Sequence, residues 1–216
     1  MTVIDTARLK QRLISGVQEL GLSLNEFQIE KMIAYLLLLS KWNSVYNLTA
    51  IRDPLEMVRQ HLLDSLSAAP AFEGAKNVLD VGAGGGLPGM MLAIVYPYIK
   101  ISMIDTVSKK TAFLTQVKTE LGLTNVTVYT GRVEKLTVDE KFDVITSRAF
   151  SELANFINWS GHLLADGGQF IAMKGVAPVQ EIKRLPAGWQ ATGVQALHVP
   201  GLDAERHLVF VKRIDN

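Results

Sequence analysis

The sequence predicts an α/β fold, with a mostly parallel, seven-stranded sheet, a C-terminal antiparallel hairpin and an N-terminal helical extension. Three observations lead to this fold class. From Asn77 onward, short apolar runs typical of strands alternate with helical segments, as in a doubly wound sheet. The residues before Asn77 carry helix signals. The apolar run 206–213 follows a weaker strand near 194–199, and the two pair most simply as a hairpin.

The first 70 residues are expected to form helices that pack on the sheet, with domain limits at 1–70 and 71–216. Ser23 and Glu26 form an S-x-x-E capping box ahead of apolar residues at helical spacing. The segment 53–56, Asp-Pro-Leu-Glu, repeats these start signals before a helix over 57–66. Between these helices, the polar and aromatic segment 41–49 is either a recognition loop or a turn against the core.

The sheet domain is expected to alternate strands and helices in this order: strand to Val81, helix from Pro88, strand 101–105, helix 109–121, strand 126–129, helix after Val133, strand 142–146 and helix 152–164. A Gly-Gly pair at 167–168 then precedes a fifth strand, which runs to Lys174. Ligands of open α/β sheets bind at the carboxyl ends of the strands, so functional residues are expected there.

Composition limits the class of protein. With 216 residues and 48% hydrophobic content, the chain can bury one substantial core. It has no cysteine, which excludes disulfides, thiolate metal sites and a cysteine nucleophile. The longest apolar run, 33–39, is too short to span a membrane, and the N-terminus lacks a signal-peptide core, so a cytoplasmic protein is expected. A net charge of +1 implies that any polyanion must be bound by a local patch.

The segment 77–89 is a buried strand followed by a glycine-dense turn that leads into a helix. Glycine adopts positive φ and lets backbone amides approach a ligand closely. Gly84, Gly86 and Gly89 also satisfy the G-x-G-x-x-G pattern of dinucleotide-binding proteins. The turn therefore predicts a site for a nucleotide-like cofactor.

Two acidic residues bear on which cofactor binds. Asp80, two positions before Gly82, can reach the ammonium group of S-adenosylmethionine (SAM), whereas it would repel a pyrophosphate. Asp105 ends the next strand, where it can accept hydrogen bonds from ribose hydroxyls, a feature shared by SAM and NAD sites. These residues favour SAM. A nicotinamide dinucleotide and a purely structural glycine turn remain alternatives.

Motifs along nearly the whole chain resemble the Rossmann-like class I SAM methyltransferases and, within them, the RsmG (GidB) family of bacterial 16S ribosomal RNA guanine-N7 methyltransferases. The matching segments are 41–43, 46–49, 61–65, 80–89, 132–134, 147–150, 174–175 and 206–207. The glycine loop departs from the family pattern at Ala83, where Thr is usual, and at Gly85, where Pro or Ala is usual. A hydroxyl contact is lost there, and the loop gains flexibility.

The resemblance implies a SAM site formed by Gly82 and Leu87 of the first loop, Val133 and Glu134 after the third strand, and Arg148 after the fourth. Asp105 would bind the ribose. Together with Asp80, Gly84 and Gly86, these residues are the expected cofactor site. The implied partner is 16S rRNA, within the small ribosomal subunit or an assembly intermediate, methylated on a guanine of the decoding-region loop. No metal is expected.

The chemistry of guanine N7 explains what this site requires. Methyl transfer from a sulfonium is an in-line displacement, so alignment of the reactants is the main contribution of the enzyme. N7 carries a free lone pair and no proton, so no general base is needed. The chain accordingly lacks the D/N/S-P-P-Y/F motif of amino-group methyltransferases after the fourth strand.

Arg148 and Lys174 are the residues expected to position the substrate, through phosphates or the guanine O6 edge. The alternative is that each is a solvated charge at a strand end. Phe150 is either a base-stacking residue or part of the core. Lys109, Lys110 and Arg132 form either a phosphate-facing patch or ordinary surface.

Histidines at 61 and 207 are expected to satisfy local hydrogen bonds rather than to bind a metal. Two other function classes stay open. One is a methyltransferase for a small molecule, since fold does not fix substrate. The other is a non-enzymatic regulator, against which the intact cofactor loop argues.

Overall fold

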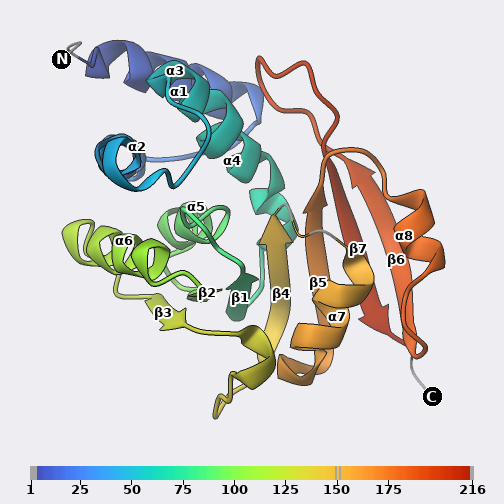
Figure 1. Cartoon of the computed structure of the whole chain (residues 1–216). Helices are drawn as coiled ribbons and strands as arrows, with labels where there is room; N and C mark the ends of the chain where they lie inside the picture. Colours follow the sequence, from blue (N-terminus) through green and yellow to red (C-terminus); the bar gives the residue numbers. More distant parts are fainter. Residues whose placement is uncertain (1–3, 149, 151, 215–216) are drawn as a thin grey trace.

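The computed structural model describes residues 4–148, 150 and 152–214. Seven strands form one sheet in the order β3-β2-β1-β4-β5-β7-β6 (Figure 1). Their bounds are β1 Asn77–Val81, β2 Lys100–Asp105, β3 Val126–Thr130, β4 Phe142–Arg148, β5 Leu164–Lys174, β6 Trp189–Ala196 and β7 His207–Arg213. Strands β1 to β5 pair in parallel, and β7 runs antiparallel to both β5 and β6. The predicted fold class is confirmed.

Helices cover both faces of the sheet, which is why its central strands are largely buried on both sides. Every residue of β1 is buried. Successive residues point to opposite faces, so Val78 joins the hydrophobic cluster under one set of helices and Leu79 the cluster under the other. The first set includes α5 (Gly89–Val95) and α6 (Ser108–Glu120); the second is α7 (Leu153–Ser160). A short helix, α8 (Val179–Lys183), follows β5.

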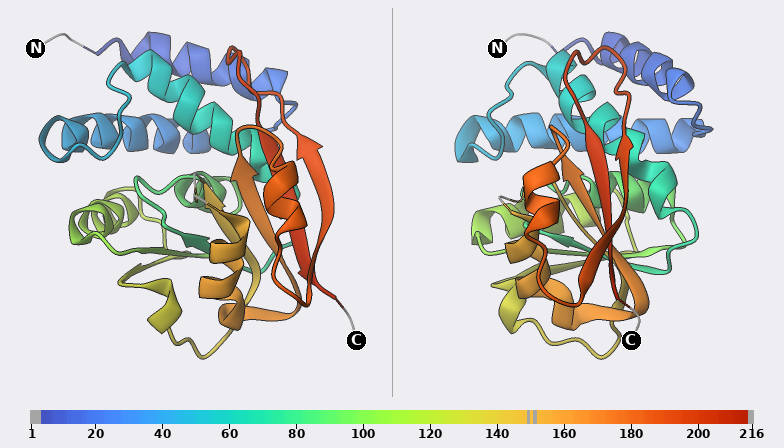
Figure 2. Two further views of the ribbon diagram at one scale, coloured as in Figure 1. Left: turned by 45° about the vertical axis from the view of Figure 1, so that its right-hand side comes forward. Right: turned by 90° about the vertical axis from the view of Figure 1, so that its right-hand side faces the viewer.

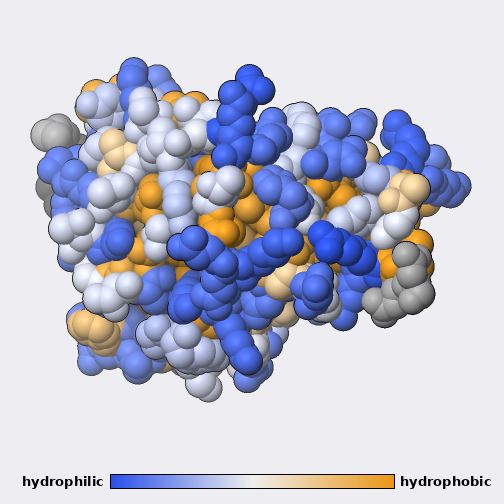
Figure 3. Space-filling model, turned by 90° about the horizontal axis from the view of Figure 1, so that it is seen from below, coloured by the Kyte–Doolittle hydropathy of each residue, from blue (hydrophilic) through white to orange (hydrophobic). Residues whose placement is uncertain are grey.

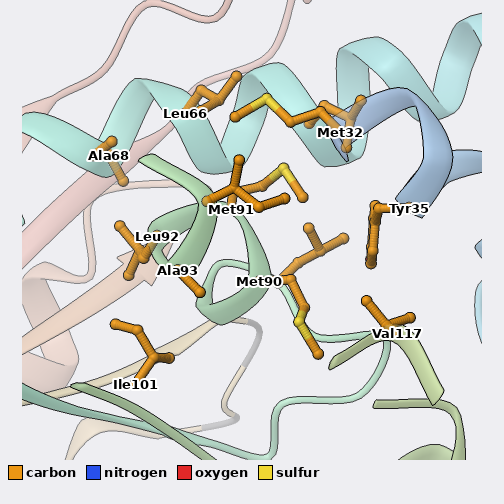
Figure 4. Close-up of a cluster of buried hydrophobic side chains, with 14 of the residues drawn as sticks. Met32, Tyr35, Leu66, Ala68, Met90, Met91, Leu92, Ala93, Ile101 and Val117 are labelled. Carbon is orange, nitrogen blue, oxygen red and sulfur yellow. The ribbon is translucent and has the colours of Figure 1, made fainter. Parts of the chain in front are cut away.

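The N-terminal helices share the core of the sheet. They are α1 (Thr6–Glu19), α2 (Glu26–Tyr46), α3 (Pro54–Met57), a π-helical segment η1 (Val58–Leu63), α4 (Asp64–Ala68) and a 3-10 turn η2 (Ala69–Phe72). Figure 2 shows α1 and α2 crossing the molecule on the side toward which β4 and β5 point. In Figure 4, Met32 and Leu66 from these helices lie around Met91 of α5. One continuous hydrophobic cluster thus joins the N-terminal helices to the sheet.

The capping box of α2 differs from the prediction. The helix begins at Glu26, so the cap residue is Asn25 and not Ser23. The Asn25 side chain accepts from the Gln28 amide (2.9 Å), and the Gln28 side chain accepts from the Asn25 amide (3.0 Å). Asn is as good a cap residue as Ser, so the cap lies two residues later than predicted while the predicted helix itself is present. The predicted cap at Asp53 is confirmed, because its carboxylate accepts from the Glu56 amide (2.9 Å).

Other differences concern element bounds. The helix expected after Val133 is only a 3-10 turn, η3 (Val133–Lys135), since few residues remain before β4. The helix expected over 152–164 ends at Ser160 and continues as a second turn, η4 (Gly161–Leu163). Strand β6 lies earlier than predicted because its register is set by pairing with β7, Trp189 opposite Arg213. Pro88 caps α5 from just before its first residue.

The segment 41–49 consists of the end of α2, up to Tyr46, and the turn that follows it. Trp42 packs on Phe113, with ring centroids 5.6 Å apart. The buried Asn43 side chain donates to the carbonyl of Ile51 (3.1 Å) and accepts from the amide of Thr49 (2.8 Å). These bonds fix the path of the chain after α2, as the structural interpretation expects, and the recognition loop stays a prediction.

The described surface has two general features. None of the helices in the described ranges is both long and apolar enough to cross a membrane. Seen from below, at the edge where β4 and β5 begin, the surface is mainly hydrophilic, with hydrophobic side chains in patches between polar ones (Figure 3).

Candidate functional site

A pocket of about 720 Å³ lies at the carboxyl ends of β1, β2, β3 and β4. The parallel arrangement brings these four strand ends to one edge, where ligands of open α/β sheets bind. The volume is that of a small-molecule or cofactor site. Five predicted site residues line it: Gly82, Asp105, Val133, Glu134 and Arg148.

The glycine loop after β1 forms one wall. Gly82, Gly84 and Gly86 have φ values of 68°, 56° and 88°, a region that side-chain-bearing residues rarely adopt. At Gly86, a β-carbon would also lie 2.7 Å from side-chain atoms of Leu114 and Met90. The backbone of the loop therefore requires glycine at positions 82, 84 and 86. Gly86 and the buried Leu87 pack inward, and Gly84 also lies outside the pocket lining.

Asp105 connects this loop to the end of β2. It is only 6% exposed. One carboxylate oxygen accepts from the Gly84 amide (2.9 Å) and the other from the Val107 amide (2.9 Å), while the Lys110 ammonium lies 3.7 Å away. The carboxylate lines the pocket in a fixed orientation, as a partner for ligand hydroxyls requires.

Asp80 lies beneath the loop. It is fully buried and outside the pocket lining. Its Oδ2 accepts from the Gly89 amide at the start of α5 (2.9 Å), and Oδ1 has no hydrogen-bond partner among the described residues. Burial raises the pKa of Asp80 to about 7. The predicted contact with the amino-acid end of SAM stays a prediction; in the structure Asp80 holds the loop to α5.

Val133 and Glu134 occupy the turn after β3. Val133 is buried and offers an apolar surface to the pocket, and Glu134 offers a carboxylate beside it. The Arg132 guanidinium lies 3.9 Å from the Glu134 carboxylate and is itself 72% exposed. An apolar wall next to a polar edge suits a nucleobase, as predicted for these positions.

Arg148, the last residue of β4, lines the pocket and pairs with the N-terminal helices. Its Nη1 donates to the carboxylate of Asp64 (3.1 Å) and to the carbonyl of Gln60 (3.2 Å). Asp64 is buried and also accepts from Nε of Arg206 (2.6 Å). The Asp64 contacts were missed from the sequence because they join residues 84 and 142 positions apart.

Lys174 ends β5 but does not line the pocket. Its ammonium is 10% exposed, lies 2.8 Å from the Glu181 carboxylate and donates to the carbonyl of Phe150 (3.0 Å). Arg148 therefore lines the pocket, whereas Lys174 does not. Lys174 is neither a solvated charge nor part of the pocket wall.

Several pocket residues were not singled out from the sequence. They are Val81, Ile104, Thr106, Val107, Gly131, Ser147 and Trp159. Ser147 donates to the carbonyl of Val81 (2.7 Å) and so ties β4 to the end of β1. Their position directly after predicted strands was the available signal, except for Trp159, which enters from α7. Lys110, Arg132 and Phe150, which were considered as alternatives, also line the pocket.

The histidines make local hydrogen bonds, as predicted. His61 contacts the Thr49 hydroxyl (2.8 Å) and the Gln60 carbonyl (3.1 Å). Burial, followed by the nearby Arg148 charge, lowers the pKa of His61 to about 4. His207 contacts the carbonyl of Gly175 (2.7 Å). Within the described ranges, no group of three or more acidic or histidine residues has the arrangement of a metal site.

The fold and the position of the pocket define a class. The solved structure of the glycopeptide N-methyltransferase MtfA is similar over 70% of this chain and 95% of its own, with a TM-score of 0.60 and 12% identity. The N-methyltransferase NodS from Bradyrhizobium japonicum, solved with S-adenosylhomocysteine, is similar over 82% of this chain and 100% of its own, with a TM-score of 0.55 and 13% identity. The fold is that of the Rossmann-like methyltransferases.

Sequence similarity assigns the family. Residues 28–209 match the GidB family, described as rRNA small subunit methyltransferase G. A ribosomal RNA small subunit methyltransferase G from Janthinobacterium sp. (strain Marseille) is 64% identical over 217 aligned positions, covering 99% of both chains. One from Neisseria meningitidis is 52% identical over 94% of this chain and 98% of its own. The chain belongs to this family. The predicted resemblance is therefore confirmed, and it excludes the alternative of a nicotinamide-dinucleotide protein.

Proposed function

We propose that the protein transfers a methyl group from SAM to N7 of a guanine in the decoding-region loop of 16S rRNA, within the small ribosomal subunit or an assembly intermediate. The observation that carries this proposal is family membership over the whole chain, together with an intact pocket at the strand ends. Because this RNA is made and assembled in the bacterial cytoplasm, the protein would act there.

The residues of the pocket fit SAM. Asp105 presents a carboxylate for the ribose hydroxyls, Val133 an apolar surface for the adenine, and Glu134 a polar edge beside it. Near the glycine loop, Oδ1 of Asp80 is buried without a hydrogen-bond partner among the described residues. This free acceptor fits the ammonium group at the amino-acid end of SAM. Bound SAM supplies a methyl carbon on a positively charged sulfur.

Cations at the pocket support an RNA substrate over a small neutral molecule. Lys110, Arg132 and Arg148 all line it, from the helix after β2 and the ends of β3 and β4. They outnumber the two carboxylates of the lining, Asp105 and Glu134, and supply the local positive charge that a chain of net charge +1 needs to bind a polyanion. The solvent-exposed Arg132 is suited to phosphates, and the more buried Arg148 to the guanine edge.

Catalysis rests on alignment of the reactants. Guanine N7 attacks through its free lone pair, so no residue has to remove a proton. Among the described residues that line the pocket there is no histidine. Arg148 is held by Asp64 and Gln60, so its orientation is set before the substrate binds. Lys174 would act through Phe150 rather than on the substrate directly.

The test combines binding and product analysis. Calorimetry is expected to show micromolar binding of SAM and S-adenosylhomocysteine, about 8 kcal/mol, and no binding of NAD. Small subunits, assembly intermediates and naked 16S rRNA from a deletion strain are then incubated with labelled SAM, and N7-methylguanine is mapped by mass spectrometry. Methylation of none of these RNAs, or binding of NAD alone, would show that the proposal is wrong.

A further inference from the structure

An aromatic pair stands at the pocket on the side of α7. Phe150, two residues after β4, and Trp159, on α7, both line the pocket. Their rings meet edge to face, with centroids 5.5 Å apart and an interplanar angle of 68°. Trp159 is 40% exposed, so part of its ring is open to a ligand in the pocket.

The pair is backed by a row of aromatic rings. Phe150 packs on Phe156 at 5.3 Å, Phe156 on Phe170 at 5.0 Å, and Phe170 on Trp189 at 5.3 Å. Phe156 and Phe170 are buried in the cluster beneath α7. The ring of Phe150 is therefore supported from behind by rigid core residues, and stacking on a supported ring costs little additional ordering.

An ion pair fixes the backbone that carries Phe150. The Lys174 ammonium donates to the Phe150 carbonyl (3.0 Å) and pairs with Glu181 on α8 (2.8 Å). The same Glu181 oxygen accepts from the Leu153 amide at the start of α7 (2.8 Å). One partly buried pair thus holds positions 150 and 153 at once, which explains why a lysine at the end of β5 turns away from the pocket.

We propose that Phe150 and Trp159 form a stacking wall for a purine base, and that Lys174 and Glu181 are positioning residues for this wall. The inference rests on the proposed function, which supplies two purines: the adenine of SAM and the target guanine. Aromatic side chains stack on bases in a way that tolerates different base identities, so this chemistry is common to both. Binding and kinetic assays distinguish whether the adenine of SAM or the target guanine stacks on this wall.

Trp159→Leu and Trp159→Phe are compared with wild type in two assays. Calorimetry with S-adenosylhomocysteine reports on adenine, and the KM for small subunits at saturating SAM reports on guanine. In Trp159→Leu, loss of base stacking is expected either to lower the affinity for S-adenosylhomocysteine or to raise the KM for small subunits, by about 5- to 150-fold. Trp159→Phe should recover most of this loss because it keeps a flat ring. Tyr98→Leu is the control, since it removes an exposed aromatic side chain outside both the pocket and the row of supporting rings.

Glu181→Gln tests the positioning role. It keeps a side chain of the same size but removes the charge that holds Lys174. The variant should impair the same quantity as Trp159→Leu, either the affinity for S-adenosylhomocysteine or the KM for small subunits, while thermal unfolding stays cooperative. The wall is disproved if neither assay changes in Trp159→Leu, or if Leu and Phe at 159 behave alike. Wild-type activity on 16S rRNA is measured in parallel, so failure of the proposed function is recognised separately.

Discussion

The buried Asp64 and the partly buried Arg148 form an ion pair, with Oδ2 of Asp64 3.1 Å from Nη1 of Arg148. Asp64 begins α4 in the N-terminal helices, and Arg148 ends β4 at the pocket. Arg206, just before β7, contacts the second oxygen of Asp64 at 2.6 Å. A single carboxylate thereby joins the N-terminal helices, the pocket and the C-terminal hairpin, and sets the orientation of the arginine at the pocket.

Replacing Arg148 should reduce activity strongly and stability only modestly. In Arg148→Ala, Asp64 keeps its bond to Arg206, so we expect a loss of about 1–3 kcal/mol in the free energy of unfolding. Methyl transfer per folded molecule should fall well over tenfold. Arg206→Ala is the control, because it breaks an equivalent bond to Asp64 at a residue that does not line the pocket. Equal activity losses in the two variants would contradict a role of Arg148 in the reaction site.

Asp80 should make stability fall as pH rises. Its pKa is about 7 in the folded protein, raised by burial, against 3.8 as the ordinary value. The folded state therefore binds this proton more tightly, and its contribution is fully present below pH 4 and lost as pH rises through 7. The effect is at most about 4 kcal/mol.

Asp80→Asn should abolish this dependence. The variant is expected to be more stable than wild type at pH 8 and about equal to it at pH 4, in urea titrations across that range. If the acid contacts SAM, calorimetry will also show weaker binding. A difference that is constant with pH would mean that Asp80 titrates normally.

Tyr35→Phe should weaken cofactor binding from a position in α2. The Tyr35 hydroxyl donates to the carbonyl of Gly85 in the glycine loop (2.6 Å). Removing it should cost about 1–2 kcal/mol of stability and loosen the loop. Tyr96→Phe is the matched control, since that hydroxyl donates to the Ala69 carbonyl (3.0 Å) away from the pocket. Only Tyr35→Phe should change the affinity for S-adenosylhomocysteine; an identical effect of both would show that the bond to the loop has no bearing on binding.

Gly84→Val should abolish cofactor binding and leave the fold intact. Gly84 has φ of 56°, and its amide holds Asp105 (2.9 Å). A β-branched residue there is strained by about 1–3 kcal/mol and will shift this bond. Gly122→Val imposes the same strain at φ of 60° on the far end of α6. Circular dichroism and calorimetry should find both variants folded and only Gly122→Val able to bind. Binding by Gly84→Val would refute the role of the loop.

Catalysis without a general base predicts a flat pH profile. With SAM and RNA both saturating, single-turnover rates should change little from about pH 6 to pH 9, without the bell shape of acid–base catalysis. His61, with its pKa lowered to about 4, stays neutral over this range. A log-linear rise that is lost when one carboxylate or histidine is replaced would move the target to a hydroxyl or an exocyclic amine.

Much of the fold and of the pocket wall was readable from the sequence because the signals are local. Alternating strands and helices predict a parallel sheet, and in such a sheet the residues directly after the strands meet at one edge. Asp105 was found in this way; the family resemblance supplied Gly82, Val133, Glu134 and Arg148, which also lie at the strand ends around the pocket. The element bounds at Asn25 and in β6 were not found from the sequence, because several residues can cap a helix and strand register depends on the partner strand.

The sequence by itself determined the family, the sheet and the backbone of the glycine loop, since these follow from residue type and spacing along the chain. Only the tertiary structure decided which charges are partnered. It placed Asp64 between two arginines, turned Lys174 toward Glu181 and brought Trp159 to the pocket. The physical reason is that side-chain pairing depends on distance in space, and residues such as Asp64 and Arg206, 142 positions apart, become neighbours only when the helices and the hairpin pack on the sheet.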